Sequence, residues 1–349
     1  MYPYALLVTA FFFFKLIDFS LTKKKYQPTH PTQNNVIIAF SLILLFMSAF
    51  RHGVGWDYYA YYWTILLDLE TNITSRGELI TESIVKLAHT NSEPLIYFII
   101  NSSICLILIT KTIKDYSEDQ WMSIFLFTCF PLFFLNSLSV VRFFSALAIV
   151  FFAARYIAKG SIIKYLICIL VASMLHSSAV IGIAMYFLSR VNLTPVRIFI
   201  LALISTSLST AANFYASSYF PQYAVYTEKT TTQEGTLAIY FFAALLLGCT
   251  IFHKQITKTH ESKIHFNCFV FGFLIYLAFY GQGTMSHRLS LYGTIFSLLI
   301  FPKLINTAFR QTNTYIKTII YISLTAIFFY SIDVGKETYI PYRTIFEKY

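Results

Sequence analysis

The stretch LSVVRFFSALAIVFFAARYIA, residues 138–158, decides the fold class of this chain. It is almost wholly apolar, and about 20 apolar residues are enough for one helix to cross a bilayer. The rest of the chain is similar: of 349 residues, 57% are hydrophobic and 12% are charged, and the mean hydropathy is +0.62. Because these values lie outside the range of soluble globular domains, the sequence predicts an all-α, polytopic integral membrane protein.

Apolar runs of this kind recur along the chain and predict about 12 transmembrane helices in a single transmembrane domain, residues 1–349. If successive helices cross the membrane in alternate directions, 16 lysines and arginines lie on one side of the membrane and 9 on the other, and Lys15 lies inside the first run. Cytoplasmic loops are enriched in these cations, so both termini are predicted to lie outside. The predicted spans are Pro3–Leu21, Asn34–Phe50, Pro94–Ile113, Gln120–Asn136, Leu138–Ala158, Ile162–His176, Ser177–Ser189, Val196–Asn213, Thr236–Phe252, His265–Tyr280, His287–Phe301 and Tyr315–Ile332.

Two of these predicted spans are short, and they meet at LHSSA, residues 175–179. A single long helix over 162–189 would reverse the orientation of everything downstream and place the basic residues 254–263 outside. We therefore expect two short or tilted helices with a corner between them.

Composition also excludes several classes of function. The net charge of +10 comes from lysines and arginines spread between apolar runs, which fits orientation in a bilayer and not nucleic-acid binding. The five cysteines all lie inside apolar runs and lack the spacing of a metal site or a disulfide framework. The first run contains Lys15 and Asp18 and ends without a small-residue cleavage site, so we expect a retained helix and not a signal peptide.

The loops predict that the working surface is the outer boundary of the membrane. Two outer loops are long, residues 51–93 and 214–235, and an outer tail covers 333–349. None has room for an ordinary soluble domain.

The first outer loop opens with FRHGVGWDYYAYY, residues 50–62, which places charges and glycines directly after an apolar run. Gly53 and Gly55 permit a sharp turn, and Asp57 can cap a following interfacial helix. Asp57 as a simple cap and Arg51 as an ordinary helix end remain the alternatives to a functional role. Residues expected on one face of that helix are Tyr58, Tyr61, Tyr62, Ile65, Leu66 and Leu69.

Two further arginines begin predicted helices at the outer face. Arg142 in SLSVVRFFSA and Arg288 in GTMSHRLSLY are each flanked by apolar residues. An arginine there is costly unless it is paired or faces a wet cavity, so both are candidate functional residues.

Three other outer positions have two interpretations each. Glu93 precedes Pro94, where the helix dipole alone favours a carboxylate. His176 suits a polar corner and a catalytic base equally. The pair Tyr342 and Arg343 forms a basic, aromatic element in the tail, where packing alone is a sufficient explanation.

Arginine forks bind phosphate oxygens bidentately, and helix N-termini add a favourable dipole. The outer set of arginines therefore fits a pyrophosphate held at a membrane surface. A carboxylate or imidazole beside it fits removal of a proton from a sugar hydroxyl.

The candidate residues, in their order along nearly the whole chain, resemble the pattern of the EpsG family of Wzy-type polysaccharide polymerases. Where family members read Gly-Thr-Asp-Tyr, this chain has Trp56, which we expect to shape the sugar pocket. The resemblance is carried by Arg51-x-x-x-Gly55-x-Asp57-Tyr58-x-x-Tyr61, Glu93-Pro94, Arg142, His176-Ser-Ser, Arg288 in HRLSLY, and the PYR of residues 341–343.

The resemblance implies a glycosyltransferase at the outer face of the bacterial inner membrane. It would move a glycan from undecaprenyl diphosphate to the non-reducing end of a second lipid-linked repeat, with a Wzz-like chain-length regulator and a flippase as partners besides membrane lipids. His176 or Asp57 would deprotonate the acceptor hydroxyl, and Glu93 would orient an arginine or a sugar. The implied diphosphate ligands are Arg51, Arg142 and Arg288, and the implied glycan contacts are Trp56, Tyr58, Tyr61, Tyr342 and Arg343.

No metal or other cofactor is expected, because the leaving diphosphate is already a good anion among arginines. The acidic pair in Asp68-Leu-Glu70 has the spacing of a metal-binding glycosyltransferase motif, but on an amphipathic surface helix we expect it to be solvated.

Two other functions remain open. A lipid-linked oligosaccharide flippase also has about a dozen helices, but a transporter should place charges near the membrane midplane. An O-antigen ligase shares the carrier chemistry and usually has a much larger outer loop.

Overall fold

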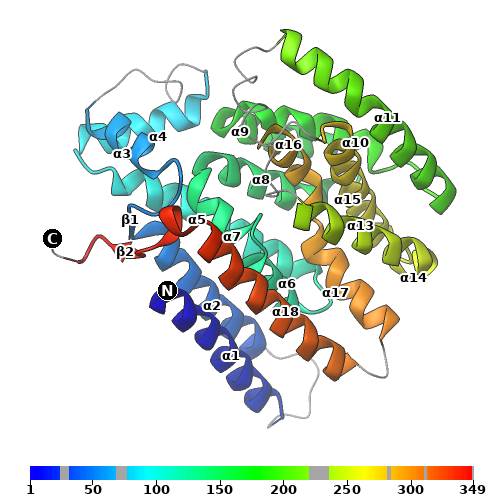
Figure 1. Ribbon diagram of the computed structural model, residues 1–349, viewed down its shortest axis with the longest axis horizontal. Helices are drawn as coiled ribbons and strands as arrows, with labels where there is room; N and C mark the ends of the chain where they lie inside the picture. The colour runs from blue at the N-terminus through cyan, green and yellow to red at the C-terminus, as the bar shows by residue number, and fades with distance from the viewer. Residues whose placement is uncertain (24–30, 68–76, 220–235, 281–283, 310–312, 348–349) are drawn as a thin grey trace. The chain divides into compact units, whose positions relative to one another are not determined.

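Over the residues that it describes, the computed structural model is all-α apart from one short antiparallel ribbon (Figure 1). It describes residues 1–23, 31–67, 77–219, 236–280, 284–309 and 313–347. The helices are α1 (Tyr2–Lys23), α2 (Pro31–Ala49), α3 (Tyr58–Leu66), α4 (Leu79–Thr90), α5 (Leu95–Tyr116), α6 (Gln120–Cys129), α7 (Phe134–Ser139), α8 (Val141–Ala158), α9 (Ile162–Leu175), the 3-10 helix η1 (Ser177–Ile181), α10 (Gly182–Leu188), α11 (Pro195–Tyr219), α13 (Thr236–Ile251), α14 (His253–Ile256), α15 (His260–Ala278), α16 (Thr284–Thr294), α17 (Ser297–Ala308), α18 (Asn313–Val334) and α19 (Lys336–Tyr339). The ribbon pairs β1 (Arg51–His52) with β2 (Arg343–Thr344).

Each predicted apolar run coincides with one helix or with two consecutive helices. By length and composition, four of the described helices can cross a membrane: Tyr2–Leu21, Leu95–Tyr116, Val141–Ala158 and Thr314–Val334. A fifth crossing is possible if α16 and α17, bent by 54° at their junction, form one span. The chain is therefore a membrane protein, and the count of about 12 spans stays a prediction.

Breaks within the apolar runs explain why fewer helices reach full length. The run predicted over Gln120–Asn136 divides into α6 and α7 around Pro131, because a residue before proline is disfavoured in helical geometry. The predicted corner at LHSSA is confirmed: α9 ends at Leu175 and η1 begins at Ser177.

The described chain forms two compact units, and each is described by itself. Unit 1 comprises Met1–Phe152, Leu170–Ser177 and Thr312–Tyr349, and unit 2 comprises Ala153–Ile169 and Ser178–Gln311. The prediction of one transmembrane domain over 1–349 stays a prediction.

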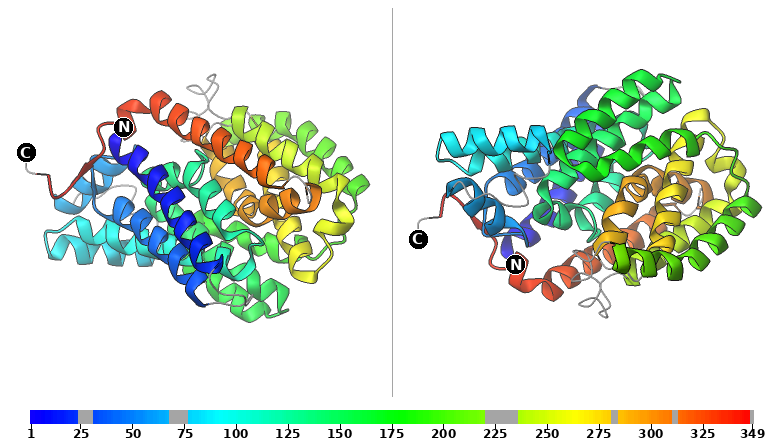
Figure 2. Two further views of the ribbon diagram at one scale, coloured as in Figure 1. Left: turned by 90° about the horizontal axis from the view of Figure 1, so that it is seen from below. Right: turned by 90° about the horizontal axis from the view of Figure 1, so that it is seen from above.

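In unit 1, α18 packs antiparallel against α1 (Figure 2). The Phe11 and Tyr321 rings lie 5.8 Å apart, and the Lys15 ammonium sits 3.6 Å above the Tyr321 ring. An ion pair of 2.6 Å between Lys317 and Asp119 joins α18 to the start of α6. Aromatic rings and the Lys15 ammonium thus connect α18 to α1, and the Lys317 ion pair connects α18 to α6.

In unit 2, the backbones of α15 and α16 approach each other closely at Gly272 and Gly293. A Cβ on Gly293 would lie 2.4 Å from the Gly272 backbone nitrogen, so only glycine permits this approach. Small residues at a contact are the usual means by which membrane helices pack closely.

The turn that the sequence predicts at the start of the first loop, after α2, is confirmed. Gly53 and Gly55 have φ of +68° and +107°, and a Cβ on Gly55 would lie 2.1 Å from the Leu138 carbonyl oxygen. The turn is followed by α3, the predicted helix; of the residues predicted on one face, Tyr58, Tyr61 and Ile65 are buried, and Tyr62 and Leu66 are half-buried. Several predicted features lie outside the described residues: Asp68, Leu69, Glu70 and residues 220–235 of the second outer loop.

Candidate active site

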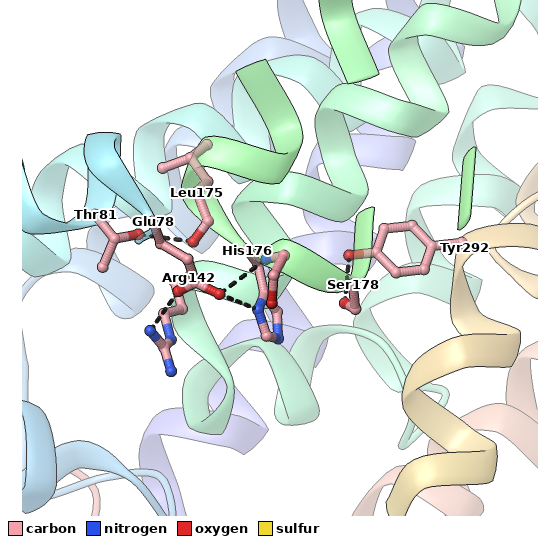
Figure 3. Close-up of polar contacts among 8 residues, drawn as sticks. Glu78, Thr81, Arg142, Leu175, His176, Ser178 and Tyr292 are labelled. Atoms are coloured by element: carbon pink, nitrogen blue, oxygen red, sulfur yellow. Dashed lines mark hydrogen bonds and ion pairs between the residues drawn. The ribbon is translucent and has the colours of Figure 1, made fainter. Parts of the chain in front are cut away.

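A buried carboxylate, Glu78, joins two of the predicted site residues in unit 1 (Figure 3). One of its oxygens accepts a 2.5 Å ion-paired hydrogen bond from Arg142 Nη1. The other lies 2.9 Å from His176 Nδ1 and accepts a 2.8 Å bond from the Ser177 backbone N–H. Glu78 is 1% exposed, so its charge is compensated by these groups and not by bulk water.

Local backbone geometry aims the Glu78 side chain inward. Glu78 precedes the first residue of α4 and follows Gly77, whose φ is +68°. It stands at the N-cap position but makes no side-chain cap hydrogen bond, because its carboxylate is turned toward Arg142 and His176. The Thr81 hydroxyl donates a 2.7 Å bond to the Leu175 carbonyl, which fixes the first turn of α4 to the end of α9.

The electrostatics of Glu78 favour the ionised form. Burial alone would raise its pKa, but the His176 hydrogen bond, the Arg142 charge and the Ser177 N–H together hold the pKa below its ordinary value. An ionised carboxylate can only accept hydrogen bonds, so His176 Nδ1 must carry the proton that it shares with Glu78.

This hydrogen bond fixes the tautomer of His176. With a proton on Nδ1, Nε2 is the ring nitrogen that can accept a proton when the imidazole is neutral. The ring is also held edge-on against Phe143, with the ring centres 5.6 Å apart. A carboxylate-oriented imidazole is the arrangement that general-base catalysis uses.

Arg142 is held from a second direction. It is the second residue of α8, it is 8% exposed, and the Tyr61 hydroxyl hydrogen-bonds its side chain. The Tyr61 ring packs at 5.0 Å on Tyr97 of α5. Helices α3, α5 and α8 thus position one guanidinium. The sequence predicted Tyr61 as a glycan contact, and in the structure Tyr61 also holds Arg142.

Arg51 has a different environment. It is 0% exposed, Nε donates to the Val54 carbonyl at 3.0 Å, Nη2 donates to the Leu138 carbonyl at 2.9 Å, and Nη1 donates to the Ser48 carbonyl. Burial lowers its pKa to about 10, so the guanidinium stays charged at neutral pH. Because its donors bind backbone around the 53–57 turn, we remove Arg51 from the diphosphate site and assign it to holding the turn.

The other residues of the opening motif surround that turn. Asp57 stands at the N-cap position of α3 but makes no side-chain cap hydrogen bond. Trp56 is 69% exposed, and its backbone N–H donates to Ser139 Oγ at 3.1 Å. Tyr58 is buried and stacks on Phe98 at 4.7 Å. Of these side chains, only Trp56 offers a large exposed aromatic surface.

The remaining predicted residues lie apart from the Glu78 contacts. Glu93 is exposed in the turn before α5. Tyr342 is buried and donates a 2.7 Å bond to the Met47 carbonyl, which favours the packing interpretation of the tail. Arg343 is exposed and pairs in the ribbon with His52.

Arg288 lies in unit 2, half-buried on α16. One turn further along the same helix, the Tyr292 hydroxyl lies 3.0 Å from Ser178 Oγ of η1 (Figure 3). The proposed role of Arg288 on the diphosphate stays a prediction.

Sequence reasoning missed Glu78. Its partners are 64 and 98 residues away along the chain, and its own surroundings, RGELITES, are typical of a polar helix start. The one local signal is Gly77, which marks a turn directly before it. Within the described ranges, no group of three His, Cys, Asp or Glu side chains is arranged to hold a metal ion.

Comparison with known proteins gave one finding. A family model described as EpsG family matches residues 34–344. No curated protein and no solved structure matches the chain.

Proposed function

Because this chain belongs to the EpsG family, we propose that it is a polysaccharide polymerase of the bacterial cytoplasmic membrane with both termini outside. Family membership indicates a polysaccharide polymerase-type function in a membrane. In the proposed reaction, a glycan leaves undecaprenyl diphosphate and joins the non-reducing end of a second lipid-linked repeat. The observation that carries this proposal is the buried Glu78, which holds a guanidinium and an imidazole together at helix ends.

Arg142 is the proposed ligand of the donor diphosphate. As the anomeric C–O bond breaks, the bonding electron pair leaves with the diphosphate, and negative charge grows on its oxygens. A fixed guanidinium stabilises that charge without reorganisation, and its planar fork suits phosphate oxygens. The ion pair with Glu78 and the Tyr61 hydrogen bond hold it in one orientation before substrate binds.

His176 is the proposed general base. Its Nε2 accepts the proton of the acceptor hydroxyl while the hydroxyl oxygen bonds to the anomeric carbon. The imidazolium that forms keeps its Nδ1–H bond to Glu78, whose negative charge stabilises it. Asp57 is the alternative base, and the exposed Trp56 is the proposed platform for a sugar ring.

The location of the charges favours an enzyme over a transporter. Arg142 begins α8 and His176 follows α9, and the topology predicted from the sequence places both of these helix ends at the outer face. A transporter is expected to have its binding charges near the midplane. A Wzz-like chain-length regulator and a flippase remain the proposed partners.

The experiment is to replace His176 in a host strain whose polymer depends on this chain. His176→Gln should abolish chain extension at unchanged protein level, leaving single repeat units on a gel of the surface polysaccharide. His260→Gln, at an exposed position, serves as the matched control and should give parental polymer. Parental chain lengths from His176→Gln would show that His176 is not the general base. The role would then be assigned to Asp57, and Asp57→Asn should abolish chain extension.

A further inference from the structure

A groove runs between α2 and α5 of unit 1, away from the Glu78 contacts. It has a volume of about 210 Å³, and its walls include Ile38 and Leu42 of α2 and Leu106 and Ile107 of α5. The side chains of Leu42 and Ile107 are more than half exposed, so the groove is open along its side. An open apolar groove between membrane helices is suited to a hydrocarbon chain.

Two lysines line one end of this groove, Lys111 and Lys114. They are three residues apart on α5, so they lie on the same face of the helix. Lys111 forms a 3.2 Å ion pair with Asp115, and no carboxylate of the described residues lies within ion-pair distance of Lys114. The end of the groove therefore carries a net positive charge that its own helix only partly compensates.

The lysine end is far from the proposed catalytic site. Tyr97, which packs on Tyr61 of that site, lies near the start of α5, and Lys114 lies near its end. At 1.5 Å per residue the two are about 25 Å apart, close to the thickness of a bilayer core. The groove extends about 12 Å along α5 from Lys114 to Leu106. The diphosphate of a donor held by Arg142 cannot reach these lysines.

We propose that this groove binds one anionic phospholipid from the opposite leaflet, with an acyl chain against Leu42 and Ile107 and the phosphate on Lys111 and Lys114. Basic sites between membrane helices select anionic headgroups, and each lysine near the surface contributes to that attraction. The apolar walls and the cationic end together fit this class of ligand, independently of the reaction that the chain catalyses.

The test is thermal unfolding of the purified full chain in detergent with added lipid. Dioleoyl phosphatidylglycerol should raise the melting temperature of the parent by a few degrees, and dioleoyl phosphatidylcholine or inorganic phosphate should not. The double variant Lys111→Gln, Lys114→Gln should lose this rise. The matched control Lys159→Gln, Lys164→Gln, at exposed positions, should keep it.

A second variant tests the groove itself. Leu42→Trp fills the apolar wall and leaves both lysines in place, so it should also lose the rise and retain less phosphatidylglycerol by native mass spectrometry. The proposal is overturned if phosphatidylcholine acts like phosphatidylglycerol, if phosphate alone reproduces the rise, or if either variant binds lipid like the parent.

Discussion

Replacing Glu78 by glutamine separates its charge from its shape. The glutamine oxygen can keep the bonds from His176 and Ser177, but its NH₂ then faces Arg142 Nη1 at a position where the parent has a 2.5 Å bond. A donor would meet a donor, and the guanidinium would stay buried without its counter-charge. Breaking one side of a buried ion pair costs about 3 to 5 kcal/mol, and the lower value applies because Arg142 retains its Tyr61 bond.

If the loss of about 3 kcal/mol also raises the free energy of the transition state, the rate of chain extension falls more than a hundredfold, since 1.36 kcal/mol corresponds to a factor of ten. The assay is polymer length on a gel from membranes with matched protein levels, with thermal unfolding of the purified chain beside it. Glu82→Gln, one turn further along α4, is the control and should behave as the parent. Parental chain length and melting temperature in Glu78→Gln would refute the reasoning.

The stability of the fold at acid pH is a second test of the role of Glu78. The pKa of Glu78 is held below its ordinary value of 4.5, so its ionised form stabilises the fold. That stabilisation is fully present above pH 4.5 and is lost as the pH falls through the lower pKa of the folded state. The stability difference between the parent and Glu78→Gln should therefore narrow as the pH falls below 4.5. A constant difference at all pH values would contradict the assigned ionisation.

Two arginine variants should give opposite results. Arg142→Lys keeps a charge for Glu78 but loses the planar fork, so the chain should fold and insert while polymerising about a hundredfold more slowly, measured as product length at matched protein level. Arg51→Lys should leave at least one of the Val54, Leu138 and Ser48 carbonyls without its donor and lower the stability by about 1 to 3 kcal/mol, measured by thermal unfolding. The folded fraction should polymerise at the parental rate. Arg197→Lys, exposed on α11, is the control for both variants and should behave as the parent. If Arg51→Lys and Arg142→Lys lost the same amount of polymer and had the same stability, this division of roles would be contradicted.

Helix positions could be predicted from the sequence because apolar runs specify them directly. The turn at Gly53 and Gly55 and the corner at residues 175–179 were also predictable, since glycines and a polar interruption are local signals. Helix length was not predictable to the same degree. A run such as 120–136 is apolar throughout, yet Pro131 divides it.

The site depends on contacts between distant residues, which sequence spacing does not contain. Arg142 and His176 were predicted individually from their positions at the outer edge, but the residue that joins them is 64 and 98 positions away. Arg51 shows the converse. Its edge position and its neighbours predicted a ligand, and only the Leu138 carbonyl, 87 residues distant, shows that its donors bind backbone.

The most direct test of the central claim is chain extension by the purified protein alone. Reconstituted in liposomes with a synthetic repeat unit on undecaprenyl diphosphate, the parent should lengthen the glycan stepwise and release undecaprenyl diphosphate, and His176→Gln should do neither. Movement of the lipid-linked glycan between leaflets without any extension would contradict the account and indicate a flippase.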